Sequence, residues 1–260
     1  MRWSAADRSG VADPRAYLVR TTSRLALNRL RTARARRESY VGPWLPEPLL
    51  TAAAPGPDPE ETAEVAEAVS LALLVVLETL SPAERAVFVL REVFGLSHAE
   101  VAAVLDRSES AVRQLAHRAR SHVEARRPRF DTDRRAAREV TERFLAACGS
   151  GDLDALLVVL APGVTLVSDG GGRARAALRP ITGADKVARF LVAVGQGATT
   201  GLDTELADVG GMPGAVVRDA AGTPVFAFAL GLVGGRVSQV LAVLNPDKLT
   251  QLSAPGARPT

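Results

Sequence analysis

The sequence predicts a multidomain protein in which helical segments, including a helix-turn-helix, precede an α+β domain with a cone-like sheet. Three observations support this prediction. Apolar residues recur with the period of a helix, about 3.6 residues, in two stretches before residue 125. A Pro-rich acidic segment over residues 39–64 separates these stretches. After residue 131, helical periodicity gives way to short apolar runs divided by Gly-rich turns, which is typical of helices followed by an antiparallel sheet.

The first helix is expected over residues 13–37, because Asp13 is a good N-cap and Pro14 suits the first helical position. Its apolar residues run from Tyr17 to Leu30. Its second half is strongly basic, and we expect that half to contact nucleic acid rather than only solvent. The expected contact residues are Asn28, Arg29, Arg31 and Arg34.

The helix-turn-helix is predicted from its own start signals. The segments 81–84 and 97–100 each place a Ser three residues before a Glu, which is the spacing of a capping box. Pro82 suits the first position of the first of these helices. Asp106 follows the second helix in a tight turn, where its side chain tolerates the left-handed backbone conformation.

The helix expected over residues 109–124 separates an apolar stripe from a polar face. Arg and amide side chains on such a face can hydrogen-bond base edges in the major groove, and hydroxyl and cationic groups can contact phosphates. The alternative is the solvated face of an ordinary helical hairpin. Two capping boxes, a short turn and a basic second helix together favour DNA. The expected DNA-binding residues are Ser108, Ser110, Arg113, Gln114, His117 and Arg118.

Residues 39–64 form a connector whose prolines keep the chain extended. Trp44 stands among these prolines, and a large aromatic side chain is costly to expose to water. We therefore expect Trp44 to dock on a neighbouring domain, either as simple packing or as part of a regulatory contact.

Charge is segregated along the chain. Residues 1–37 carry ten Arg and two Asp, a net charge of +8, whereas residues 38–81 carry eight carboxylates and no Lys or Arg, a net charge of −8. Residues 82–130 have nine Arg and six acids, a net charge of +3, and residues 131–260 balance at thirteen each. Two basic blocks suit a protein that grips a polyanion at two points. Alternatively, the acidic connector neutralises its basic neighbours, and both can hold.

The C-terminal domain is expected to begin with helices and continue as a sheet. Helices are predicted over residues 136–148, 153–160 and 184–194, and strands over 164–168, 174–178, 202–209, 215–218, 225–233 and 237–244.

Catalysis in such a cone needs a carboxylate base and a Tyr, a His or a protonated acid to hold an oxyanion. Residues 131–260 contain no His, Tyr or Trp, and the candidate bases Asp154, Asp169 and Asp203 have no evident partner. We therefore expect no enzyme activity. A small apolar ligand is possible in the cone, because the inward positions are nearly all aliphatic.

Composition excludes several other classes of protein. Cys148 is the only cysteine, so no internal disulfide can form, which suits a reducing cytoplasm. His98, His117 and His122 have no cysteines or dense carboxylates nearby, so we expect neither a metal site nor a cofactor. The most apolar run, residues 71–77, is far too short to cross a bilayer, and we expect a cytoplasmic protein with no membrane partner.

Together these residues resemble an extracytoplasmic-function sigma factor, of the subgroup with a C-terminal extension similar to SnoaL and nuclear-transport-factor-two-like domains. Residues 81–127 resemble sigma region four, and residues 13–37 resemble the end of sigma region two. Three further signatures of the subgroup are Trp44-Leu45-Pro46-Glu47-Pro48, Asp169-Gly170-Gly171-Gly172-Arg173 and Asn245-Pro246-Asp247-Lys248-Leu249.

The resemblance implies a division into a partial region two (1–38), an acidic Pro-rich linker (39–64), region four (65–128) and the extension (131–260). It implies that the protein directs core RNA polymerase to promoters, with region four reading the −35 element and region two the −10 element. It also implies that the extension regulates activity without a separate anti-sigma factor. The residues expected between the extension and the sigma core are Trp44, Leu45, Pro46, Pro48, Asp169, Gly170, Gly171, Gly172, Arg173, Asn245, Pro246 and Asp247.

One departure from the family concerns region two. In the family this region has several helices, and the helix that grips the polymerase precedes the one that reads the promoter. Only the later part matches here, so either the coding sequence starts upstream of Met1 or polymerase binding is weakened. Two other classes are considered: a DNA-binding regulator without polymerase engagement, and a cyclase- or isomerase-like enzyme with a DNA-binding appendage. A desolvated Asp beside a hydrogen-bond donor in a C-terminal cavity would favour the enzyme.

Overall fold

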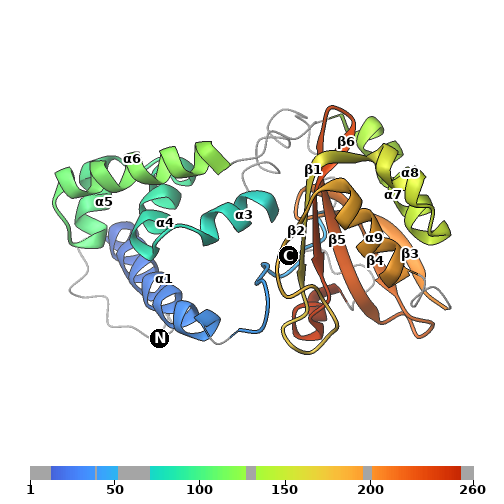
Figure 1. Cartoon of the computed structure of the whole chain (residues 1–260). Coiled ribbons are helices and arrows are strands. Elements are labelled where there is room, and N and C mark those ends of the chain that lie inside the picture. Colours follow the sequence, from blue (N-terminus) through green and yellow to red (C-terminus); the bar gives the residue numbers. More distant parts are fainter. Residues whose placement is uncertain (1–12, 39, 52–70, 127–132, 196–200, 253–260) are drawn as a thin grey trace. The chain divides into compact units, whose positions relative to one another are not determined.

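The computed structural model describes residues 13–38, 40–51, 71–126, 133–195 and 201–252 (Figure 1). At residues 31, 33–38, 72 and 126 it describes the backbone alone. The chain divides into two compact units. The first, the helical unit, combines residues up to 38 with residues 76–126, and the second, the extension unit, combines residues 39–75 with the chain from 127 onward.

The helical unit is built around a helix-turn-helix. Its elements are α1 (Pro14–Glu38), the end of α3 (Leu71–Glu78), α4 (Pro82–Phe88), the π-helix η2 (Val89–Val93), α5 (His98–Leu105) and α6 (Glu109–Arg126). Buried aliphatic side chains of α4, η2, α5 and α6 form its core, with Val87, Val101 and Val112 fully buried. Helix α1 contributes only partly buried side chains, such as Val19, to this core.

The helix starts in this unit are fixed locally, as the sequence predicts. Ser81 and Glu84 form one capping box, and Ser97 and Glu100 form another, with the side chain and backbone hydrogen bonds of both present. Asp106 has φ 56° and ψ 55° and ends α5 in the left-handed conformation. These three predictions are confirmed.

The extension unit is a six-stranded sheet with helices on one face (Figure 1). The strand order is β2-β1-β6-β5-β4-β3, antiparallel throughout except for the parallel pair β1 and β6. The strands are β1 (Leu160–Asp169), β2 (Ile181–Thr182), β3 (Asp203–Val209), β4 (Met212–Arg218), β5 (Pro224–Val233) and β6 (Arg236–Val243). The helices are α7 (Arg134–Ser150), α8 (Leu153–Val159) and α9 (Ala184–Gly195), followed after the sheet by the short 3-10 turns η3 (Pro246–Lys248) and η4 (Thr250–Leu252).

Each face of this sheet has its own core. On one face α7, α8 and α9 bury aliphatic residues together with Phe144 and Phe228, whose ring centroids are 5.9 Å apart. On the other face, the connector residue Leu45 and Leu71 of α3 pack with side chains of β4, β5 and β6 and with Leu249 and Leu252. The second core is therefore completed by residues that lie far upstream of the sheet in the sequence.

The predicted fold class, a helical region with a helix-turn-helix followed by an α+β domain, is confirmed. Two details differ. Residues 174–178 are not a strand: the chain turns at Gly171 and Gly172, both with positive φ, and the strand beside β1 is β2. Helix α3 was not expected, because its apolar run has no period to identify it. The described connector residues, 40–51, group with the extension unit. Among the described helices, none combines the length and the apolar character needed to cross a membrane.

Candidate functional site

Helix α6 presents one polar face to solvent. The residues expected to bind DNA are all exposed at this face or at the turn before it: Ser108, Ser110, Arg113, Gln114, His117 and Arg118. The opposite face of the helix is buried in the core of the helical unit through Val112, Leu115, Ala116, Ala119 and Val123. Packing of the apolar stripe therefore fixes which side chains face outward.

The start of α6 is held by Ser108. Its hydroxyl accepts a hydrogen bond from the Ala111 backbone N–H at 3.2 Å and lies 3.1 Å from the Ser110 hydroxyl. Unpaired N–H groups and the helix dipole make such a helix start favourable for a phosphate oxygen. The two serines therefore lie at a position that suits binding of a phosphate of the nucleic-acid backbone.

Three arginines of α6 form ion pairs. Arg113 pairs with Glu109 on the same helix at 2.6 Å, Arg118 pairs with Glu84 of α4 at 3.3 Å, and Arg120 pairs with Glu92 of η2 at 2.7 Å. The Ser81 hydrogen bond holds the pKa of the Glu84 carboxyl below its usual value, with a smaller contribution from Arg118. Glu84 is therefore ionised at neutral pH.

The second set of expected DNA contacts lies on α1. Asn28 and Arg29 are exposed there. Arg31 and Arg34 belong to the same helix, but their side chains lie outside the described part of the structure. Tyr17, Leu18 and Leu25 are exposed apolar residues of this helix.

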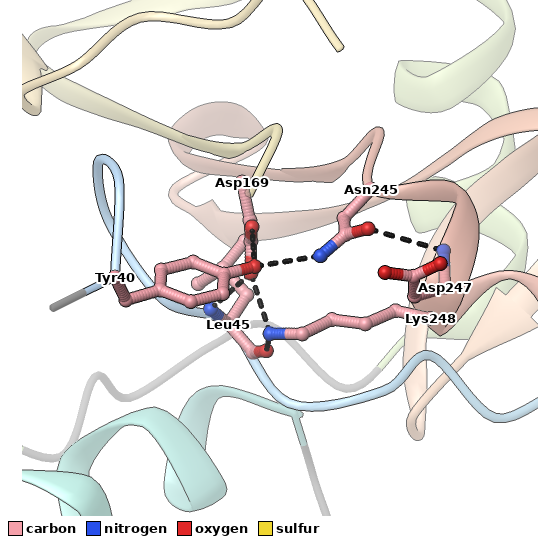
Figure 2. A network of polar contacts seen from close by, with 6 residues as sticks. All are labelled: Tyr40, Leu45, Asp169, Asn245, Asp247 and Lys248. Carbon is pink, nitrogen blue, oxygen red and sulfur yellow. Dashed lines mark hydrogen bonds and ion pairs between the residues drawn. The ribbon is translucent and has the colours of Figure 1, made fainter. Parts of the chain in front are cut away.

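A second site lies in the extension unit, where the three subgroup signatures meet (Figure 2). Its centre is Asp169 at the end of β1, whose side chain is fully buried. One carboxylate oxygen accepts a hydrogen bond from the Tyr40 hydroxyl at 2.6 Å. The other accepts the Leu45 backbone N–H at 2.8 Å and the Lys248 ammonium at 2.7 Å. The carboxylate thus binds the connector and the C-terminal turn at once.

Lys248 is a buried lysine, with only 7 % of its surface exposed. Besides Asp169, its ammonium donates to the Leu45 carbonyl oxygen at 2.5 Å. It lies 4.0 Å from the centroid of the Trp44 ring and 5.0 Å from that of Tyr40. A cation at these distances is attracted by the faces of aromatic rings. The ammonium therefore holds the connector through one carbonyl and two rings.

Asn245 and Gly171 complete the arrangement. The Asn245 amide donates to the Tyr40 hydroxyl oxygen at 2.8 Å, and its carbonyl oxygen accepts the Asp247 backbone N–H at 3.1 Å. Gly171 has φ 58°, and a Cβ there would overlap the Asn245 amide and lie 2.7 Å from the Tyr40 hydroxyl oxygen. Only glycine permits both this conformation and this close approach.

The electrostatics of this site favour a closed, paired state. Burial and the hydrogen bond to Asp169 raise the pKa of Tyr40 to about 12, so its hydroxyl is protonated and donates at neutral pH. A buried carboxylate and a buried ammonium are each costly alone, and removing either partner leaves an uncompensated charge. The network therefore links connector docking to the burial of both charges.

The structure brings together most of the residues that the sequence placed between the extension and the sigma core. Trp44, Leu45, Asp169 and Asn245 contact this network, and Gly170–Gly172 form the adjoining turn. Pro46 and Pro48 are buried connector residues, whereas Pro246 is exposed. Arg173 and Asp247 form an exposed ion pair at 3.3 Å beside the network. All of these residues belong to the extension unit.

Sequence reasoning missed Tyr40 and Lys248 as site residues. A signal for Lys248 existed, since the chain holds only two lysines, Lys186 and Lys248, and thirty arginines. A buried site of this size suits a compact ammonium better than a planar guanidinium, as at Lys248, whereas Lys186 is exposed. The signal for Tyr40 was its position a few residues before Trp44 in the connector.

Comparisons with known proteins identify the family of this chain. Residues 70–123 match the family model "Sigma-70, region 4". The ECF RNA polymerase sigma factor SigJ of Mycobacterium tuberculosis is 40 % identical over 259 residues, covering 96 % of this chain and 82 % of the relative. The probable ECF RNA polymerase sigma factor SigI of the same organism is 34 % identical over 249 residues, covering 94 % and 81 %.

A solved structure is also similar. The crystal structure of Mycobacterium tuberculosis SigJ matches with a TM-score of 0.72 and 38 % identity, covering 97 % of this chain and 87 % of that chain. The match spans the helical elements, the connector and the extension. The chain therefore belongs to the extracytoplasmic-function family of RNA polymerase sigma factors, which direct the polymerase to specific promoters for transcription initiation.

Proposed function

We propose that this sigma factor reads the −35 promoter element with α6 and the −10 element with the second half of α1, while its extension modulates initiation by binding the connector. Core RNA polymerase and promoter DNA are its partners, which places its action in the cytoplasm.

The observation that carries the first part is the composition of the exposed face of α6. Gln114 and His117 lie along the middle of this face, Arg113 and Arg118 lie toward its two edges, and Ser108 and Ser110 stand at its start. Arg and Gln side chains can form paired hydrogen bonds with purine edges in the major groove, which is the geometry that distinguishes base pairs. The hydroxyls suit phosphate contacts, which position the helix without reading sequence.

The test is Arg113→Ala in the full chain. We expect a loss of about 1–3 kcal/mol in binding to promoter DNA relative to random DNA, because one base-reading side chain is removed. The measurement is promoter binding and in-vitro transcription with purified core polymerase. Arg135→Ala is the matched control, since Arg135 also pairs with a Glu four residues away on a helix but lies in the extension unit. Undiminished promoter discrimination by Arg113→Ala would contradict the proposal.

The second part follows from where the connector stands in the chain. Residues 40–51 lie between α1 and region four, and they are bound to the extension at both ends of the segment. Tyr40, Trp44 and Leu45 join the Asp169 network, and Thr51 donates its backbone N–H to the Asp208 carbonyl oxygen at 3.0 Å. Docking thus limits the freedom of the chain that joins the two DNA-reading elements, and we infer that its release changes initiation.

An enzymatic role for Asp169 has less support than this structural one. Asp169 is desolvated and accepts a hydrogen bond from Tyr40, as a buried base would. Its charge is neutralised by Lys248, and its oxygens are occupied by the connector. We therefore assign it to holding the connector and infer no catalysis. A small apolar ligand in the extension is supported only by the aliphatic lining of the core under α7 and α9.

A further inference from the structure

We propose that Glu84 and Glu92 are positioning residues for promoter reading: they hold the two flanking arginines of α6, set the rotation of this helix and withhold two cations from the DNA backbone. The inference rests on the proposed role of α6 as the DNA-reading helix. It assigns a function to two acids that do not themselves face DNA.

The pair of Arg120 and Glu92 joins α6 to the π-helix η2. The guanidinium donates to a Glu92 carboxylate oxygen at 2.7 Å, across 28 residues of sequence. Half of the Arg120 side chain and about a third of the Glu92 side chain are exposed, 50 % and 36 %. The hydrogen bond and the charge of Glu92 raise the pKa of Arg120 above its usual value. In this geometry the guanidinium is turned toward the protein instead of toward a phosphate.

The pair of Arg118 and Glu84 joins α6 to the start of α4. Its two charged groups are 3.3 Å apart. Glu84 is itself fixed, because it accepts the Ser81 backbone N–H at 3.1 Å and the Ser81 hydroxyl at 2.6 Å. A carboxylate that caps one helix and pairs with the next fixes the relation between the two helices.

The two pairs lie on opposite flanks of α6. Successive residues of a helix are about 100° apart, so Arg118 and Arg120 lie about 160° apart around the axis when measured across its exposed side. The exposed middle stripe, formed by Gln114 and His117, lies between them, whereas Arg113 lies about 20° from Arg120 on the same flank. If α6 rotated about its axis so that Arg118 came closer to Glu84, Arg120 would move away from Glu92. The opposite rotation would have the opposite effect. The two carboxylates therefore favour one rotation, the one that points the middle stripe outward.

Each pair also removes a cation from the non-specific binding surface. A protein that neutralises phosphates with Lys or Arg releases counterions, and its affinity falls with salt in proportion to the number of phosphates contacted. Binding to random DNA competes with binding to the promoter. Arginines that are paired with acids contribute less to random-DNA binding, so the pairs favour discrimination between promoter and random sequence. This predicts that removal of Glu92 strengthens binding to random DNA and makes it more salt-dependent.

The decisive variant is Glu92→Gln in the full chain, with binding to a random-sequence duplex measured over a range of KCl concentrations. We expect the plot of log affinity against log salt to steepen by about 0.9, the value for one added phosphate contact. Random-duplex affinity should rise several-fold at low salt, so that the ratio of promoter to random binding falls. Glu84→Gln should act in the same direction.

Glu100→Gln is the matched control. Glu100 forms the same capping box with Ser97 that Glu84 forms with Ser81, and it belongs to the same unit. Its hydrogen-bond partner is Ser97 rather than an arginine of α6. Its replacement removes the same charge and the same type of cap. An equal change of salt slope in Glu100→Gln would overturn the inference, because net charge alone would then explain the effect.

A double-mutant cycle separates positioning from general electrostatics. In an Arg120→Ala background, Glu92→Gln should leave the salt slope unchanged. If Glu92→Gln alone leaves slope and affinity as in the unaltered chain, the inference fails, while loss of promoter binding in Arg113→Ala still supports α6 as the reading helix. If Arg113→Ala also has no effect, the proposed function itself fails.

Discussion

At the scale of single residues, the choice of lysine at position 248 follows from the space around it. Its ammonium meets one carboxylate oxygen, one carbonyl oxygen and two ring faces, all within the buried interface of connector and extension. A guanidinium carries five N–H donors in a rigid plane, and these would have to find acceptors among the rings. A compact ammonium with few donors fits this site.

Lys248→Ala should therefore destabilise the extension unit by about 3–5 kcal/mol, because Asp169 would stay buried without its cation. The exposed Lys186, on α9, provides the control, and Lys186→Ala should have almost no effect. Urea unfolding can be followed by Trp44 fluorescence in a Trp3→Phe background, since the chain contains two tryptophans. Equal stability of the two alanine variants would show that the ion pair does not hold the connector.

At the scale of elements, the turn after β1 forms part of the surface on which the connector docks. Gly171 lets the Tyr40 hydroxyl and the Asn245 amide come together above the turn, and Gly172 lies against Val41. Farther along, Leu50 bridges to Val209 at the end of β3. The connector thus touches the extension both at the β1 end and at the β3–β4 turn, which explains why a Pro-rich segment has a defined path.

Gly171→Ala tests this turn against Gly222→Ala. Both glycines have positive φ, 58° and 78°, but a Cβ at Gly222 meets no atom within 4 Å. We expect about 1–2 kcal/mol of backbone strain in either variant. Gly171→Ala should cost about 1–3 kcal/mol more from overpacking, and it should release the connector. The readout is again the fluorescence emission of Trp44. A blue-shifted emission in Gly171→Ala, as expected when Trp44 is docked, would refute the role of this turn in docking the connector.

At the scale of the whole molecule, the position of the connector in the sequence does not predict the unit in which it packs. The connector precedes region four in the chain, yet it completes the second core of the extension through Leu45, which is fully buried. Apolar burial of this kind makes the extension unit depend on residues far upstream. Binding or release of the connector is therefore a property of the full chain.

Leu45→Asp should undock the connector, because it places a charge at a fully buried position. Leu49→Asp makes the same substitution in the same segment at a side chain that is 50 % exposed. We expect Leu45→Asp to lower the unfolding temperature of the extension unit and to change transcription from the promoter with core polymerase. Its affinity for random DNA should match that of Leu49→Asp. Identical transcription by the two variants would argue against modulation through the connector.

The local parts of this protein were determined by the sequence. Both capping boxes, the left-handed Asp106 and the exposed face of α6 depend on residues within one or two turns of each other, so spacing alone predicts them. The subgroup signatures indicated which segments matter in the extension. They did not indicate how those segments pair.

Tertiary structure decided the rest, because it depends on contacts between distant residues. Tyr40 and Asp169 are 129 positions apart, and Asp169 and Lys248 are 79 apart. Residues 174–178 form a short, mostly apolar run that could suit a strand, but β1 already pairs with β2 and β6, and the Ala177 N–H donates to the Ser168 hydroxyl oxygen and not to a neighbouring strand. No local pattern encodes which strand edges are already occupied, nor that a buried carboxylate will meet a lysine from the end of the chain.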